Sequence, residues 1–227
     1  HTLPNDSALV IDAAQTAFGH LDYATPPGGA VVSGPRKTLG ISDGAVLTAA
    51  DIADSDTKAV DALPTASTAA TVVAEAHALL ARRDPTAESQ ALRLLTEAEN
   101  RFPEYPSRMS DTARAALAMI DRDQHHAART SNFKRLYARF RHLSAMPGNR
   151  NGTPFCLPIL SDNRENVLAR LHTARVFATP LWPDTVHNPE THPIAADLSK
   201  RLIALPIDQR YSETDEDELA DIVESCL

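Results

Sequence analysis

The chain has 227 residues, a length that fits one large domain or two ordinary ones. Apolar residues make up 43% of it and charged residues 23%, an ordinary globular balance that excludes a wholly disordered chain. The formal net charge of −8 argues against a nucleic-acid partner, and no run approaches the ~20 apolar residues of a membrane helix, so no membrane partner is expected either.

Three short apolar runs near the start of the chain predict strands. They cover residues 8–14, 30–32 and 45–48, and turn-forming residues separate them, among them residues 25–29 and Asp43-Gly44. Because the runs are short and do not alternate with polar residues, we expect a mostly parallel sheet with both faces covered.

Helical spacing replaces these runs from residue 50 onward. Apolar residues recur three and four positions apart, which predicts helices over residues 70–83, 87–102, 111–122 and 124–145. Asp84-Pro85 ends the first of them, and the turn-forming string Pro147-Gly148-Asn149 marks a boundary. We therefore expect a first domain over residues 1–145.

The remaining chain alternates between strands and helices. Strands are expected over residues 155–160, 176–182 and 203–207, and helices over residues 163–175, over residues 193–202 and after Ser212. Asp162 is expected to cap the first of these helices and Ser212 the last, where Asp215 completes a capping box. This pattern predicts a small C-terminal α/β domain over residues 150–227.

Asp12 is the first candidate for chemistry, because it stands at the end of the first predicted strand and Gln15 follows shortly after. The C-terminal ends of parallel strands are where α/β sheets bind ligands. A buried carboxylate there needs a cationic partner, and the protonated ring nitrogen of a cofactor is one such partner. The alternative interpretation is that Asp12 caps a helix.

The second candidate is the string from Ser33 to Lys37, which follows the second predicted strand. A lysine directly after a buried strand and beside Arg36 is a candidate Schiff-base nucleophile. The Ser33 hydroxyl and nearby backbone amides could hold a phosphate. The alternative is an ordinary surface pair of cations, in which Arg36 makes a structural salt bridge instead of contacting a substrate or a neighbouring subunit.

Together the two strings resemble the DegT/DnrJ/StrS family of pyridoxal-phosphate-dependent sugar aminotransferases. The resemblance continues over the strings at residues 38–45, 106–110, 129–133, 181–183 and 205–212. It covers essentially all of this chain. Family members normally carry a substantial portion before the strand with the Asp-Ala-Ala-Gln string, so the chain resembles the C-terminal part of such an enzyme.

The resemblance implies a fold and a site. The fold would be α/β: the rear part of a fold-type I large domain, with a mostly parallel sheet and helices, followed by a small C-terminal α/β domain. The cofactor would be pyridoxal 5′-phosphate, with Asp12 on the pyridine nitrogen, Gln15 near the ring hydroxyl, Ser33 on the phosphate and Lys37 as the catalytic Schiff-base residue. The chain departs from the family at Ile11, where an acid is usual, and in the interval of four between Ser33 and Lys37, where five is common.

The resemblance also implies an activity and partners. Relatives that lack the lysine carry out dehydration-type chemistry, so Lys37 favours transfer of an amino group, with glutamate as donor, to a nucleotide-linked keto-sugar. The partners would be these two small molecules and a second copy of the chain in a homodimer. The alternative from another class is a non-catalytic remnant that serves as a dimerisation or binding module.

Other reactive residues are expected to have structural roles. Cys156 and Cys226 lie too far apart in the sequence for a metal cluster or a disulfide scaffold, and reduced thiols fit a cytoplasmic protein. His125 and His126 point about 100° apart on a helix, so we expect a solvated helix face and no metal site. Trp182 is expected to pack in the core or at a hinge.

Overall fold

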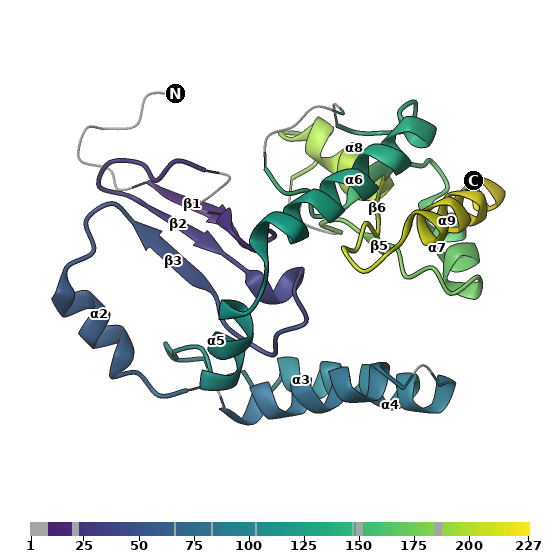
Figure 1. Ribbon diagram of the computed structural model, residues 1–227. Coiled ribbons are helices and arrows are strands. Elements are labelled where there is room, and N and C mark those ends of the chain that lie inside the picture. Colours follow the sequence, from purple (N-terminus) through teal and green to yellow (C-terminus); the bar gives the residue numbers. More distant parts are fainter. Residues whose placement is uncertain are drawn as a thin grey trace. The chain divides into compact units, whose positions relative to one another are not determined.

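The computed structural model describes residues 9–19, 23–65, 67–82, 84–102, 104–146, 148, 152–183 and 188–227. The chain divides into two compact units, His1–Asp121 and Arg122–Leu227 (Figure 1). This boundary lies before the one expected between residues 145 and 150. Parts of that expected boundary, together with residues 8 and 83 at the ends of a predicted strand and helix, lie outside the described residues.

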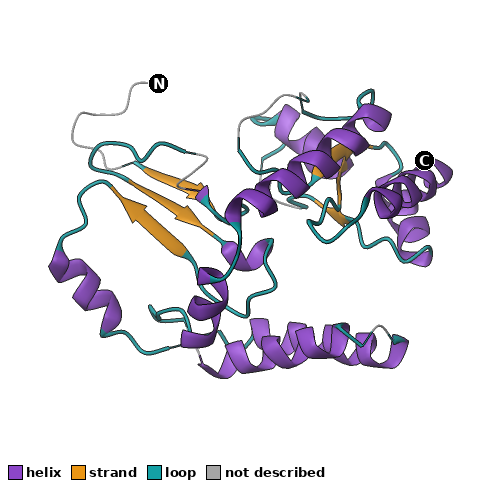
Figure 2. Ribbon diagram, in the orientation of Figure 1, coloured by secondary structure: helices purple, strands orange, loops and turns teal. Residues whose placement is uncertain are grey.

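The first unit contains a three-stranded sheet in the order β1-β2-β3 (Figure 2). Its strands are β1 (Val10–Ala13), β2 (Ala30–Ser33) and β3 (Val46–Ala49). β1 and β2 are parallel, as predicted, whereas β2 and β3 are antiparallel, so the prediction of a mostly parallel sheet is wrong for β3. The reason lies in the connection from β2 to β3, which contains only the 3-10 turn η1 (Pro35–Lys37), whereas a parallel crossover usually needs a full helix.

One face of this sheet is covered and the other is open within the described residues. Ala13, Val31 and Ser33 are buried, whereas the side chains of Val10 and Leu47 on the opposite face are 61% and 57% exposed. The segment after β1 covers the buried face, because a Cβ at Gly19 would lie 2.9 Å from Ala13 Cβ. The expectation that both faces are covered is therefore wrong for the described part of this unit.

Four helices complete the described part of the first unit. They are α2 (Asp54–Asp61), α3 (Ser67–Leu80), α4 (Pro85–Glu99) and α5 (Asp111–Ala118). The last three confirm the helices that the sequence predicted over residues 70–83, 87–102 and 111–122. Asp84 caps α4, since its Oδ1 accepts a 2.9 Å hydrogen bond from the backbone nitrogen of Ala87. α3 and α4 form a helical hairpin with a small apolar core of its own (Figure 1).

The second unit is a small α/β structure, as predicted. It comprises α6 (Arg122–Phe140), β4 (Leu157–Leu160), α7 (Arg164–Thr173), β5 (Thr179–Pro180), α8 (Pro193–Arg201), β6 (Leu202–Leu205) and α9 (Glu213–Cys226). Its sheet is antiparallel with the order β4-β6-β5. α6 belongs to this unit because Phe133, Leu136 and Phe140 pack in one core with the central strand β6 and with α9.

The two predicted helix caps of this unit have different outcomes. The capping box at α9 is confirmed: Ser212 Oγ accepts from the Asp215 nitrogen at 3.2 Å, and Asp215 Oδ2 accepts from the Ser212 nitrogen at 2.7 Å. Asp162 does not cap α7, because the capping residue is Asn163. The Asp162 carboxylate instead lies 2.7 Å from the Arg201 guanidinium at the end of α8. Across the described segments, no helix is both long enough and apolar enough to cross a membrane.

Candidate functional site

Asp12 is exposed near the end of β1 and stabilises the turn that follows the strand. Its Oδ1 accepts a 2.9 Å hydrogen bond from the backbone nitrogen of Ala14. In the described residues 14–18 no helix begins directly after Asp12, so the alternative in which Asp12 caps a helix is wrong. The other carboxylate oxygen has no partner among the described residues and remains available to a ligand.

Ser33 ends β2 on the covered face of the sheet. It pairs with Ala13, and its hydroxyl, which is 1% exposed, donates to the Val46 carbonyl at 3.3 Å. Asp12 pairs instead with Val32. Because side chains alternate along a strand, Asp12 and Ser33 point to opposite faces. The structure thus places these two residues on neighbouring strands without bringing their side chains together.

Lys37 ends the turn η1 and is exposed. Its backbone nitrogen donates to the Gly34 carbonyl at 3.0 Å, which holds the turn closed. The Lys37 ammonium has no hydrogen bond or ion pair with any residue that the structure describes. A lysine side chain without a partner can reach a ligand without first breaking an ion pair.

The turn that carries Lys37 packs against the segment that carries Gln15. The Gly34 nitrogen donates to the Thr16 carbonyl at 2.9 Å, and a Cβ at Gly34 would lie only 2.1 Å from the Ala14 carbonyl oxygen. Only glycine permits this approach of two backbones. The two strings singled out in the sequence are therefore neighbours in space, and half-buried Gln15 lies in the turn beside η1.

Arg36 makes structural contacts in the first unit, in line with the salt-bridge alternative. Its Nη1 lies 3.0 Å from Glu99 Oε1, and its Cζ lies 5.0 Å from the centre of the Phe102 ring. Both partners belong to the end of the α3–α4 hairpin. The guanidinium is thereby engaged, whereas the neighbouring Lys37 ammonium is free.

Asp43 is a buried acceptor that the sequence analysis did not single out as a site residue. Its carboxylate accepts from the Ser110 nitrogen at 2.8 Å, the Ser110 hydroxyl at 2.7 Å and the Ser42 hydroxyl at 3.1 Å. Gly44 beside it has a φ of +100°, and a Cβ there would lie 2.3 Å from Met109 Cε. Two strings of the family resemblance, at residues 38–45 and 106–110, thus contact each other through Asp43 and Ser110. This contact is structural and holds the start of α5 in place.

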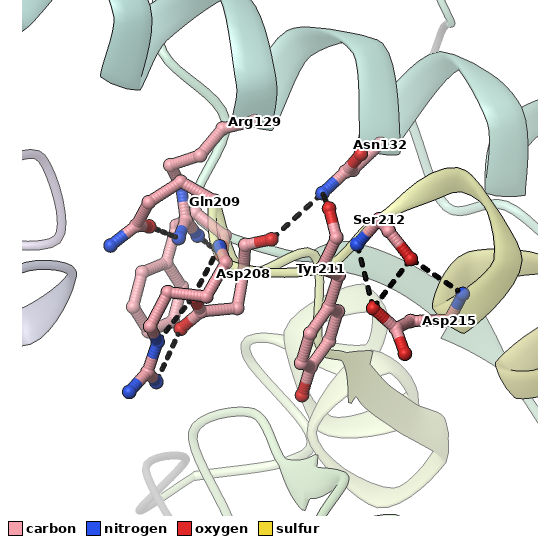
Figure 3. A network of polar contacts seen from close by, with 9 residues as sticks. Arg129, Asn132, Asp208, Gln209, Tyr211, Ser212 and Asp215 are labelled. Carbon is pink, nitrogen blue, oxygen red and sulfur yellow. Dashed lines mark hydrogen bonds and ion pairs between the residues drawn. The ribbon is translucent and has the colours of Figure 1, made fainter.

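Two further strings of the family resemblance, at residues 129–133 and 205–212, contact each other in the second unit (Figure 3). Arg129 on α6 donates to the Pro154 carbonyl at 2.8 Å, to Gln209 Oε1 at 2.9 Å and to the Phe155 carbonyl. Asn132, one helical turn later, donates to the Asp208 carbonyl at 2.7 Å. Burial lowers the pKa of the Arg129 guanidinium, and nearby Asp208 opposes this effect. The network fixes the loop between β6 and α9 onto α6.

Three other residues discussed from the sequence are buried to different extents. His125 is buried instead of solvated, and burial, followed by the charge of Arg129, lowers its pKa to about 4. Cys156 is half-buried, and burial raises its thiol pKa to about 12. Trp182 is 56% exposed, contrary to the expected packing. The described residues contain no group of three or more His, Cys, Asp or Glu side chains that could hold a metal ion.

Comparisons with known proteins return one partial similarity. No protein-family model matches the chain, and no curated protein does. Among solved structures, a DegT DnrJ EryC1 StrS aminotransferase from Brucella abortus matches at 18% identity with a TM-score of 0.39. The match covers 50% of this chain and 33% of that one, so the similarity spans about a third of the aminotransferase.

Proposed function

We propose that this chain carries the lysine and the acidic residue of a pyridoxal-phosphate-dependent aminotransferase. One observation carries the proposal: the turn that ends at Lys37 packs directly on the segment that follows Asp12, through Gly34 and the carbonyl of Ala14. Both segments leave neighbouring parallel strands at the same edge of the sheet. This edge is where α/β sheets bind ligands.

The residues at this edge fit pyridoxal phosphate through its aldehyde and its ring nitrogen. Lys37 offers an exposed amine without a partner among the described residues, and Asp12 offers an exposed carboxylate with one oxygen free. The fit to the phosphate is poorer than the fit to the aldehyde and ring nitrogen, because the Ser33 hydroxyl already donates a hydrogen bond to the Val46 carbonyl. A role for Ser33 in phosphate binding stays a prediction. It requires the buried hydroxyl to turn away from that carbonyl and to become accessible, although its side chain points to the sheet face opposite Asp12.

Bound pyridoxal phosphate supplies an electron-withdrawing ring that stabilises negative charge on the carbon beside the amine. Asp12 would hold the proton on the ring nitrogen and so keep the ring electron-withdrawing. Lys37 Nζ would hold the cofactor until the amino donor replaces it, and would then move a proton between the two carbons that flank the transferred nitrogen. Gln15 would donate to the ring hydroxyl and orient the ring.

The substrate class is proposed from the same strings of sequence. The similarity to the DegT/DnrJ/StrS family supports glutamate as the amino donor and a nucleotide-linked keto-sugar as the acceptor. It also supports a homodimer in the cytoplasm, in which a second copy of the chain completes the site. The retained Lys37 favours amino transfer over the dehydration chemistry of relatives that lack a lysine at this point.

Borohydride trapping tests the proposal. The protein is incubated with pyridoxal phosphate, reduced, digested and mapped by mass spectrometry, and its four lysines, Lys37, Lys58, Lys134 and Lys200, make the assignment clear. We expect stoichiometric label at Lys37, its loss in Lys37→Arg and its weakening in Asp12→Asn. Lys58→Arg is the matched control and should leave the label unchanged. Even or absent labelling would contradict the proposal and favour a non-catalytic binding module.

A further inference from the structure

We infer that Arg36 is the positioning residue for Lys37, and that it acts by anchoring the turn η1 to Glu99 and Phe102. The inference rests on the proposed function, because it concerns the same lysine. It assigns to the arginine of the Arg-Lys pair a role that does not involve contact with substrate or cofactor.

The two cations of the pair have opposite environments. The Arg36 guanidinium is held on both sides, by the carboxylate of Glu99 at 3.0 Å and by the Phe102 ring at 5.0 Å, whereas the Lys37 ammonium is free. In a 3-10 turn, consecutive side chains point about 120° apart. Anchoring Arg36 on the hairpin therefore limits the directions in which the Lys37 side chain can point.

The two residues that hold Arg36 belong to a packed helical hairpin. Phe102 packs on the apolar cluster formed by Val72, Val73 and Ala98 between α3 and α4. Glu99 is the last residue of α4. The guanidinium is thus joined to a helical hairpin that has its own core, and not to a loose segment of chain.

The anchor adds to the few hydrogen bonds that hold this short turn. η1 has three residues, and its own hydrogen bonds are those from the nitrogens of Lys37, Thr38 and Leu39 to the Gly34 and Pro35 carbonyls. Gly34 holds the start of the turn on the Thr16 carbonyl, and Arg36 holds the turn on the hairpin. An exposed ion pair together with a cation–π contact contributes about 1 kcal/mol, which corresponds to about a fivefold change in the ratio of ordered to disordered turn.

The test measures the concentration of pyridoxal phosphate that gives half-maximal borohydride-trapped label at Lys37. We expect this concentration to rise in Arg36→Gln by up to about fivefold, the limit set by the change in the ratio of ordered to disordered turn. The charge-swapped double variant Arg36→Glu/Glu99→Arg should reverse part of this rise, because it rebuilds the ion pair in the opposite sense but not the cation–π contact with Phe102. In the same variants, background label at Lys58 and Lys200 should not change.

A matched control separates positioning from general destabilisation. Arg101 forms a similar exposed ion pair with Glu97 on α4 and has no hydrogen bond or ion pair with η1 in the described structure. Arg101→Gln should leave the half-maximal concentration unchanged. In the protein without cofactor, hydrogen exchange at the Leu39 amide, which donates to the Pro35 carbonyl at 2.8 Å, should become about fivefold faster in Arg36→Gln and not in Arg101→Gln.

The outcomes distinguish this inference from the proposed function. Equal labelling of Lys37 in the wild type and Arg36→Gln would overturn the positioning role and leave the proposed function intact. A half-maximal concentration in the charge-swapped variant that is no lower than in Arg36→Gln would also overturn it, because the ion pair with Glu99 would then contribute nothing to the anchoring. Absence of label at Lys37 in the wild type would refute the proposed function and the inference together.

Discussion

Glu216 in the first turn of α9 is the buried carboxyl whose ionisation should weaken the fold. The side chain has no exposed surface, and neither of its oxygens has a hydrogen-bond partner among the described residues. Burial raises its pKa from 4.5 to about 7; the charge of Arg135 opposes this effect, and the charges of Asp215 and Asp217 add to it. We therefore predict that Glu216→Gln stabilises the protein at alkaline pH.

The size and the sign of the effect follow from proton linkage. A carboxyl pKa of 4.5 in the unfolded chain and about 7 in the folded chain corresponds to about 3 kcal/mol. Because the folded state binds the proton more tightly, this stability is fully present below pH 4.5 and is lost as the pH rises through 7. Glutamine stays neutral, so the variant should match the wild type near pH 4 and exceed it by up to about 3 kcal/mol at pH 8.

Urea unfolding at pH 4, 6 and 8 measures this difference. The matched control is Glu218→Gln, which removes an exposed carboxylate from the same helix and should change the free energy of unfolding by less than about 0.5 kcal/mol at every pH. The other acidic groups titrate alike in both proteins and cancel in the comparison. A stability difference for Glu216→Gln that is the same at pH 4 and pH 8 would refute the reasoning.

Three further predictions concern buried polar and strained positions. Asp43→Ala leaves the Ser110 donors without their acceptor and should cost about 2–3 kcal/mol in urea unfolding, whereas exposed Asp51→Ala should cost little. Gly44→Ala should lower the melting temperature, because a Cβ would lie 2.3 Å from Met109 Cε at a φ of +100°; an unchanged melting temperature would contradict the close approach. The thiol of Cys156, whose pKa burial raises to about 12, should react with iodoacetamide at pH 8 far more slowly in the native protein than in urea, and equal rates would show that it is accessible.

The candidate site was only partly predictable from the sequence. The positions of Asp12 and Lys37 just inside and just after two strands follow from apolar runs and turn residues, and the structure confirms these strands. The faces to which Asp12 and Ser33 point follow from the pairing of β1 with β2, which is not a local property. The roles of Asp12, Gln15, Ser33 and Lys37 toward a cofactor stay predictions.

The sequence by itself determined the features that depend on neighbours along the chain. Helical spacing predicted α3 to α6, and the string from Ser212 to Asp215 predicted the start of α9, because the period of a helix and its cap are set within a few residues. Short apolar runs likewise located β1 to β3, although their ends were shifted by a residue or more.

Only the tertiary structure decided the features that join distant segments. The antiparallel direction of β3, the burial of His125 and the contacts of Asp43 with Ser110 and of Arg129 with Gln209 all depend on which segments meet. The sequence around a polar side chain does not indicate a hydrogen-bond partner that lies 67 or 80 residues away. Its burial is favourable only once that partner is in place, and packing of the whole unit supplies the partner.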